Sequence, residues 1–217
     1  MYIFDLDGTL TDSNGLWVEV DQEFLSRRGL VMTREYEDVV GRSIFPAAAD
    51  FTRAYYHLPD SPQAIMAEWE ALAAHHYRDL VPLKPGALEV LDRCRARGIP
   101  MALFTACRPA LARLVLDRFR LEDYFSRVVY AEELGLDKHD PRSFPRLCRL
   151  LGARPEDCTL FDDNPSNCAA ARAAGMRVVG VYDDFYSHRQ EELKGSCHRY
   201  IRSLSELLTP ADKPAET

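Results

Sequence analysis

The residues best suited to chemistry begin at the amino end, where Asp5 and Asp7 follow an apolar run that starts at Tyr2. A short apolar run closed by a glycine, here Gly8, predicts a buried strand that ends near Asp5. Because strand side chains repeat every second residue, both carboxylates are expected on one side. Two carboxylates this close repel each other without a cation, and Mg²⁺ is the common oxygen-liganded ion at phosphate sites. By itself, Asp-x-Asp is equally typical of an acidic turn in solvent.

A second acidic pair, Asp162 and Asp163, directly follows the apolar run Cys158–Phe161. Two adjacent carboxylates at the end of an apolar strand are costly unless a cation compensates them. An Asp-Asn-Pro turn that caps a helix would account for one of the two acids, but not for both. The pair is therefore a second indication of a cation site.

Two further polar residues stand where apolar runs end. Thr105 closes the run that begins at Ile99, and its hydroxyl and the next backbone N–H, that of Ala106, can donate to a phosphate. The alternative is that Thr105 caps a helix beginning at Pro109. Lys138 lies in an acidic loop and is one of only four lysines against 23 arginines. A compact ammonium can contact a phosphate and a carboxylate together, whereas the alternative is a solvated loop lysine.

The string from Asp5 to Ser13, Asp-Leu-Asp-Gly-Thr-Leu-Thr-Asp-Ser, closely resembles the first motif of the haloacid dehalogenase superfamily, most of whose members are Mg²⁺-dependent phosphatases. Thr105, the Lys-His-Asp-Pro string from Lys138, and the acidic pair with the alanine-rich segment after it resemble the second, third and fourth motifs, in order. One departure is His139, which stands where the family usually has proline.

The resemblance implies a role for each matched residue. Asp5 would be the nucleophile and Asp7 the general acid and base. Thr105, Ala106 and Lys138 would bind the phosphate. Mg²⁺ would be held by Asp5, the carbonyl of Asp7, Asp162 and Asp163.

The elements that must position these residues alternate between strands and helices after Gly86. Unalternated apolar strands separated by helices predict an α/β fold, a Rossmann-like parallel sheet with helices on both faces. Residues 14–83 instead show helical spacing without strand-like alternation, which predicts an inserted all-α cap of about four helices. The expected division is a core of residues 1–13 and 84–208, a cap of residues 14–83, and a fraying tail of residues 209–217.

The composition limits the kinds of molecule that the protein could bind. The net charge of −7 disfavours nucleic acid and anionic membranes. No window approaches the roughly 20 apolar residues of a membrane span. The six cysteines form no C-x-x-C pair, which is typical of reduced thiols in a cytoplasmic protein. We expect a cytoplasmic protein from this composition, and the resemblance implies a Mg²⁺-dependent phosphatase that hydrolyses a small phosphomonoester through an aspartyl-phosphate. Sugar phosphates, phosphoglycolate and nucleotide-like esters all remain possible substrates, and the oligomeric state is not readable from the sequence.

Some members of this family have other activities, which need residues that can be looked for in this sequence. Dehalogenases lack the second Asp, so Asp7 counts against them, and phosphonate hydrolases need a cap lysine that residues 1–83 lack. Mutases of the beta-phosphoglucomutase type carry a cap His and a cap Arg where this chain has Trp17 and Ile44. A mutase stays the alternative, and a non-catalytic phosphometabolite-binding protein the second. Trp17, Arg42 and Tyr36 are the cap residues expected to face the substrate.

Overall fold

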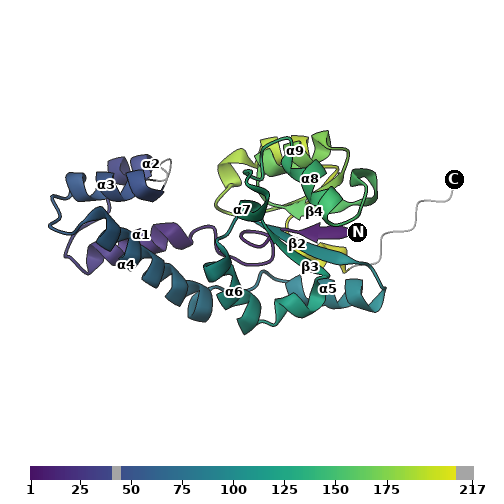
Figure 1. Cartoon of the computed structure of the whole chain (residues 1–217), viewed down its shortest axis with the longest axis horizontal. Coiled ribbons are helices and arrows are strands. Elements are labelled where there is room, and N and C mark those ends of the chain that lie inside the picture. The colour runs from purple at the N-terminus through teal and green to yellow at the C-terminus, as the bar shows by residue number, and fades with distance from the viewer. Residues whose placement is uncertain (41–44, 209–217) are drawn as a thin grey trace. The chain divides into compact units, whose positions relative to one another are not determined.

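The computed structural model describes residues 1–40 and 45–208, so Arg42 and the tail of residues 209–217 lie outside the described residues. The chain divides into two compact units. One unit joins Met1–Asn14 to Val81–Thr217, and the other is Gly15–Leu80. The first unit, called the core unit below, contains the sheet, and the second, called the helical unit, contains helices alone among its described elements (Figure 1).

The core unit is built on six parallel strands in the order β3-β2-β1-β4-β5-β6. The earliest strand is central, since Tyr2 pairs with Met101 on one side and with Thr159 on the other. The predicted parallel sheet is therefore confirmed. The strand bounds are β1 Tyr2–Phe4, β2 Met101–Thr105, β3 Arg127–Tyr130, β4 Thr159–Asp162, β5 Arg177–Val181 and β6 Arg199–Ile201.

Both faces of the sheet are covered, which explains why the strands carry unbroken apolar runs. Helices α5 (Ala87–Ala96) and α6 (Pro109–Arg118) lie on one face, and α8 (Ser143–Leu150) and α9 (Pro165–Ala173) lie on the other (Figure 1). Because side chains alternate along a strand, the residues of β1 point to the two faces of the sheet in turn. Ile3 joins the apolar cluster that contains residues of α8 and α9, while the Phe4 ring stacks on Phe161 at a centroid distance of 4.5 Å.

The remaining elements of the core unit are short. The helix α7 (Ala131–Leu134) was not predicted, because four residues are too few for a periodic pattern. Residues 187–196 begin as a 3₁₀ turn and continue as α10 (Gln190–Ser196). Residues 204–207 form another 3₁₀ turn. All 3₁₀ turns of the described residues are Leu121–Tyr124, Pro155–Asp157, Ser187–Arg189 and Leu204–Leu207.

The helical unit contains the expected four helices. They are α1 (Leu16–Ser26), α2 (Arg34–Val40), α3 (Phe45–Tyr55) and α4 (Pro62–His75), the last followed by a π turn at His76–Leu80. Ser61 begins α4 by accepting the Ala64 N–H at 3.2 Å, with Pro62 at the first helical position. The interior contains Phe24 and Trp69, whose rings meet edge to face at 5.7 Å.

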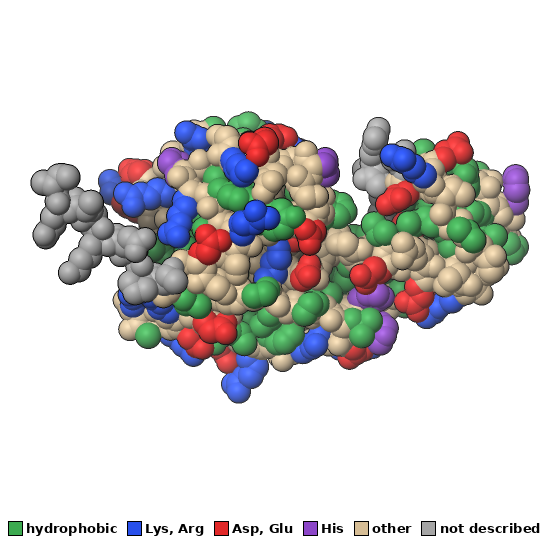
Figure 2. Space-filling view, turned by 180° about the vertical axis from the view of Figure 1, so that it is seen from behind, with side chains coloured by type: hydrophobic (Ala, Val, Ile, Leu, Met, Phe, Trp, Pro, Cys, Tyr) green, Lys and Arg blue, Asp and Glu red, His purple; other side chains and the backbone are tan. Residues whose placement is uncertain are grey.

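Figure 2 shows basic and acidic side chains intermixed on the face it presents, without a broad area of one sign. Across the described ranges, every helix is too short or too polar to cross a bilayer.

Candidate active site

The strand order brings the predicted site residues to one edge of the sheet. Asp5 follows β1, Thr105 ends β2, and Asp162 ends β4. Because β1 lies between β2 and β4, these three positions are neighbours at the carboxyl ends of parallel strands. This edge is where ligands bind in open α/β sheets.

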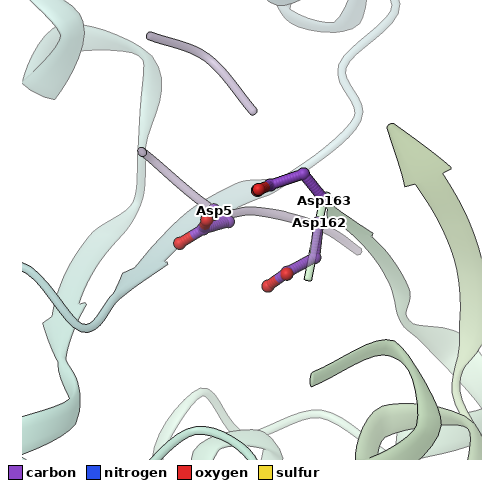
Figure 3. Close-up of side chains that lie close together, drawn as sticks. All are labelled: Asp5, Asp162 and Asp163. Carbon is purple, nitrogen blue, oxygen red and sulfur yellow. The ribbon is translucent and has the colours of Figure 1, made fainter. Parts of the chain in front are cut away.

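Three carboxyl groups converge there (Figure 3). One oxygen each of Asp5, Asp162 and Asp163 lies within 4.8 Å of the others. The three side chains come from two adjacent strands, and the residues are only 6%, 0% and 1% exposed, respectively. Acidic groups this deeply buried require a compensating charge.

Part of that charge comes from Lys138, which is itself buried. Its ammonium donates to Asp5 Oδ1 at 2.6 Å and to Asp162 Oδ2 at 2.8 Å. Burial alone would lower the pKa of Lys138, but attraction to Asp162 and Asp5 outweighs burial and raises that pKa. Lys138 is therefore a fixed positive charge between the two strand ends, and the solvated-loop alternative is wrong.

The charge of the three carboxyl groups that Lys138 does not neutralise is negative. Burial raises the pKa of Asp5 well above its ordinary value; Lys138 opposes this rise, while Asp162 and Asp163 add to it. Burial and the neighbouring Asp162 likewise raise the pKa of Asp163 to about 7. Three ionised carboxylates with one ammonium leave a formal charge of about −2, which suits a divalent cation with oxygen ligands. The donor set therefore fits Mg²⁺.

The carboxylates of the acidic pair are also held by neutral donors. Thr9 Oγ1 donates to Asp163 Oδ1 at 2.9 Å, and Asn14 Nδ2 donates to Asp163 Oδ2 at 2.7 Å. Asn167 Nδ2 donates to Asp162 Oδ1 at 3.2 Å. The predicted helix cap is also present, since Asn164 begins α9 by accepting the N–H groups of Ser166 and Asn167. The cap thus uses Asn164 and leaves both acids to the site.

Asp7 lies in the turn that follows β1, directly before Gly8. Gly8 adopts a φ of +78°, a left-handed conformation that favours glycine. Ser13 Oγ donates to Asp7 Oδ1 at 2.6 Å. Thr11 Oγ1 lies 2.9 Å from Ser13 Oγ and donates to the Leu6 carbonyl, so these two hydroxyls line the turn. The Asp7 carboxyl therefore has a fixed orientation, and its charge is close enough to raise the pKa of Asp5.

Thr105 is fully buried, and its Oγ1 accepts the Cys107 N–H at 2.9 Å. The first helical residue, Pro109, is preceded by Arg108 as the cap, without a side-chain cap bond. The alternative that Thr105 caps this helix is therefore wrong. A hydroxyl that accepts from Cys107 keeps its own proton for a ligand. Ala106, next along the chain, is exposed at the same strand end.

A hollow of about 350 Å³ adjoins these residues. Its lining includes Ala106, the neighbour of Thr105, and Asp137, the neighbour of Lys138. Among the described residues, two acidic residues and no Lys or Arg line it; the lining residues are Ala106, Ala131, Glu132, Gly135, Leu136 and Asp137. The volume is in the range of small-molecule sites.

The predicted cap residues fare differently. Trp17 lies on α1 and is 39% exposed, so its expected contact with substrate stays a prediction. Tyr36 is fully buried within the helical unit, where its hydroxyl lies 3.0 Å from Thr52 Oγ1 and its ring stacks with Phe51. The expectation that Tyr36 faces the substrate is therefore wrong. Arg42 lies outside the described residues.

Sequence reasoning missed most of the polar residues that hold the carboxylates. Thr9, Ser13 and Asn14 stand in or beside the first motif, and their closeness to the acids was the available signal. Asn167 is one helical turn after the acidic pair, a spacing that returns its amide to Asp162. Lys84 and Asp183 also contact this group, and only the scarcity of lysine pointed to Lys84.

Comparisons with known proteins agree with this site. A family model described as a haloacid dehalogenase-like hydrolase matches residues 1–175. Hexitol phosphatase B of Escherichia coli strain K12 is 30% identical over 183 residues, covering 82% of each chain. Phosphoglycolate phosphatase 1 of Pseudomonas aeruginosa is 27% identical over 223 residues, covering 100% of this chain and 81% of the relative.

A solved structure shares the fold over nearly the whole chain. The crystal structure of a candidate beta-phosphoglucomutase from Thermotoga maritima superposes with a TM-score of 0.83 at 23% identity. The match covers 95% of this chain and 97% of that chain. At this identity the likeness concerns the fold alone.

Proposed function

The chain belongs to the haloacid dehalogenase-like hydrolases, and on that premise we propose that it is a Mg²⁺-dependent phosphatase of small phosphomonoesters that works through an aspartyl-phosphate. The observation that carries the proposal is the buried group of Asp5, Asp162, Asp163 and Lys138. Such a group is costly to bury, and it suits a place where a dianionic phosphoryl group and a divalent cation meet.

In the first step Asp5 attacks phosphorus in line with the leaving oxygen. The bond between phosphorus and that oxygen breaks as the Asp5–phosphorus bond forms. Asp7 gives its proton to the leaving oxygen, so an alcohol departs. Ser13 holds Asp7 Oδ1, which fixes the direction from which the proton arrives.

In the second step water attacks the phosphorus of the aspartyl-phosphate. Asp7, now ionised, takes a proton from this water, and the bond to Asp5 breaks. Inorganic phosphate forms, and Asp5 returns to its starting carboxylate. Each residue then has its initial protonation state, so the cycle needs no further reactant.

Lys138, Thr105 and the Ala106 N–H would hold the transferring phosphoryl group. Lys138 already has its ammonium between two strand ends, so it brings positive charge without rearrangement. Asp5, Asp162 and Asp163, with the Asp7 carbonyl, would bind Mg²⁺. When bound, the cation neutralises charge on the phosphoryl oxygens and helps to align them.

The leaving group that these surroundings favour is a sugar or polyol. The hollow beside Ala106 has the Glu132 and Asp137 carboxylates on its wall, which accept hydroxyl protons and repel a second anion. The relatives named for hexitol phosphate and phosphoglycolate hydrolysis represent the two possibilities, and this charge favours the former. We also assign recognition of the leaving group to the helical unit, in which Trp17 would contact it.

Phosphate release from a panel of esters tests the proposal. The panel contains hexitol phosphates, sugar 6-phosphates, nucleoside monophosphates and phosphoglycolate, each with Mg²⁺ and with a chelator. We expect Mg²⁺-dependent release, fastest from polyol or sugar phosphates, and none from Asp5→Asn, which keeps the shape of the nucleophile. No release from any ester would reject the phosphatase proposal, and faster release from phosphoglycolate would reject the assigned leaving group.

Mutase activity is the second candidate, since the fold is shared with a candidate beta-phosphoglucomutase. Trp17 occupies the place of the cap histidine that such mutases carry, so we expect no conversion of sugar 1-phosphates to 6-phosphates. Conversion without net phosphate release would replace the hydrolase proposal by a mutase. Absence of both activities would leave a binding role.

A further inference from the structure

Lys84 is a partly buried lysine, with 15% of its side chain exposed, and the catalytic scheme above does not use it. Its ammonium donates to three oxygens: the Gly8 carbonyl at 2.7 Å, the Tyr182 carbonyl at 2.8 Å and Asp183 Oδ2 at 2.6 Å. Because an ammonium has three N–H donors, this set satisfies all of them. Lys84 thereby joins the turn after β1 to the end of β5.

Asp183 is the anion of this pair and is only 4% exposed. While its Oδ2 accepts from Lys84, its Oδ1 accepts the Phe185 N–H at 3.0 Å and Asn14 Nδ2 at 3.1 Å. Three donors on different segments therefore fix the plane of this carboxylate. Asp183 lies outside the carboxyl group of three that would bind the cation.

Asn14 connects Asp183 to that group. Its Nδ2 has two hydrogens, and it contacts two carboxylates, Asp183 Oδ1 at 3.1 Å and Asp163 Oδ2 at 2.7 Å. The amide thus separates two like charges that would otherwise repel each other. Thr9 holds the second oxygen of Asp163 at 2.9 Å. Each oxygen of Asp163 has one donor and keeps a lone pair for a cation.

The same residues stand where the chain leaves the core unit and returns to it. Asn14 is the last residue of the first segment, and Lys84 lies near the start of the second. The two segments are also joined by backbone bonds, from Asp12 N–H to the Pro82 carbonyl and from Lys84 N–H to the Leu10 carbonyl. The chain around Asn14 is therefore held from both sides.

We propose that Lys84 and Asp183 are positioning residues for the metal site: they hold the Asn14 amide against Asp163 and so set the affinity of the site for Mg²⁺. The inference rests on the proposed function for the presence of the cation, but it concerns residues outside the catalytic scheme. Lys84 acts on Asp183, Asp183 orients Asn14, and Asn14 places Asp163. Outer contacts of this kind typically change metal affinity by about 10- to 100-fold.

A double-mutant cycle on Mg²⁺ binding tests this order of action. Calorimetric titration of the full chain with MgCl₂, without substrate, gives the Kd of the unaltered protein, Asn14→Ala, Asp183→Ala and the double variant. We expect each single change to weaken binding about tenfold and the double variant to be no weaker than the weaker single variant, because both act through one contact. Asp184→Ala, which removes the adjacent exposed acid, is the matched control and should leave the Kd unchanged.

A second variant covers the case in which Asp183→Ala leaves the Lys84 charge without its counterion and the chain fails to fold. Lys84→Met with Asp183→Leu removes both charges together and leaves nothing to hold the Asn14 amide, so it should bind Mg²⁺ about tenfold more weakly than the unaltered chain. Additive losses in the cycle, unchanged Kd values in the single variants, or unchanged binding by this pair would each overturn the inference alone. If the unaltered chain binds no Mg²⁺, the proposed metal dependence fails and the inference fails with it.

Discussion

The core unit buries acidic groups and the helical unit half-buries one, Asp21, but the two units compensate these acids in different ways. In the core unit Asp5 and Asp162 accept an ammonium, that of Lys138, at 2.6 and 2.8 Å. In the helical unit Asp21 accepts the Tyr36 hydroxyl at 3.3 Å. Burial raises the pKa of Asp21 to about 7, and the Tyr36 hydrogen bond opposes this rise only in part.

Hydroxyl groups surround Asp21. Tyr36 Oη donates to Asp21 Oδ1 at 3.3 Å and lies 3.0 Å from Thr52 Oγ1. Thr52 Oγ1 in turn donates to the Ala48 carbonyl at 2.7 Å. One long hydrogen bond from a neutral hydroxyl offsets the cost of burying a charge only in part, so the neutral acid is favoured.

This difference in the partners of the acids distinguishes an active site from an ordinary protein interior. The core unit arranges cations and N–H donors around ionised acids, leaving a negative charge for a divalent ion, whereas the helical unit arranges hydroxyls around an acid that is best neutral. Both acids have raised pKa values, so the pKa alone does not identify the active site. The partner of the acid does.

The largest effect is expected from Lys138→Met, which removes the ammonium from the core group. Phosphate release should fall about 10²- to 10³-fold, because one donor to the phosphoryl oxygens is lost. The free energy of unfolding without Mg²⁺ should fall by about 3–5 kcal/mol, because the buried carboxyl groups of Asp5 and Asp162 lose their counterion. Lys194→Met, at an exposed pair with Glu191, is the matched control for steady-state kinetics and denaturation. Retention of full activity by Lys138→Met would remove the distinction between the two units.

Gly8→Ala probes how closely the core site is packed. A Cβ on Gly8 would lie 2.0 Å from Asn14 Nδ2 and 2.4 Å from Asp163 Oδ2, in addition to the strain of φ +78°. Gly98 has a similar φ of +66° with no atom within 4 Å, so Gly98→Ala isolates the strain. We expect a loss of about 1 kcal/mol of unfolding free energy for Gly98→Ala and about 3 kcal/mol for Gly8→Ala. Urea denaturation measures both, and equal losses would show that the Gly8 contacts do not matter.

Mg²⁺ itself should stabilise the core unit. At a concentration of about 100 times Kd, binding contributes about 2.7 kcal/mol, a rise in Tm of about 5–10 °C. Both tryptophans, Trp17 and Trp69, lie in the helical unit, so their fluorescence follows that unit separately. We expect this rise in Tm when thermal melting is monitored by circular dichroism, and a smaller rise in Tm when it is monitored by tryptophan fluorescence. Asp163→Asn should abolish it, and a rise that persists in that variant would place the cation elsewhere.

The smallest effect is expected from Asp21→Asn. The folded pKa of Asp21 is about 7 against an ordinary 3.8, so the folded state binds the proton more tightly. Below about pH 4 Asp21 is protonated in both states and does not reduce the free energy of unfolding. As the pH rises from there through the folded pKa of about 7, the free energy of unfolding falls. Since Asp21 is partly exposed, we expect a loss of about 2 kcal/mol between pH 5 and 8. Tryptophan fluorescence during urea unfolding should show this slope in the unaltered chain and a flatter one in Asp21→Asn. Equal slopes would mean that Asp21 is ionised in the folded state.

The sequence predicted the strand ends well, because each ends an apolar run with a polar residue, as at Asp5 and Thr105. It did not predict the contacts of Lys84 with Asp183, because partners nearly 100 residues apart depend on the position of β5 in the sheet. Tyr36 was misplaced for a related reason. An aromatic residue at helical spacing points inward or outward according to the neighbouring helices, and here it packs against residues of α3.

The central position of β1 also affects how the chain is made. The first strand to leave the ribosome pairs with strands that begin roughly 100 and 160 positions later. At about 5–20 residues per second, β1 waits some 5–20 seconds for its first neighbour, while the helical unit, whose contacts are local, can already fold. A nascent chain therefore carries an apolar strand without a sheet during this interval. Chaperone dependence during synthesis should accordingly follow the length of the insertion after β1 more than the stability of the finished protein.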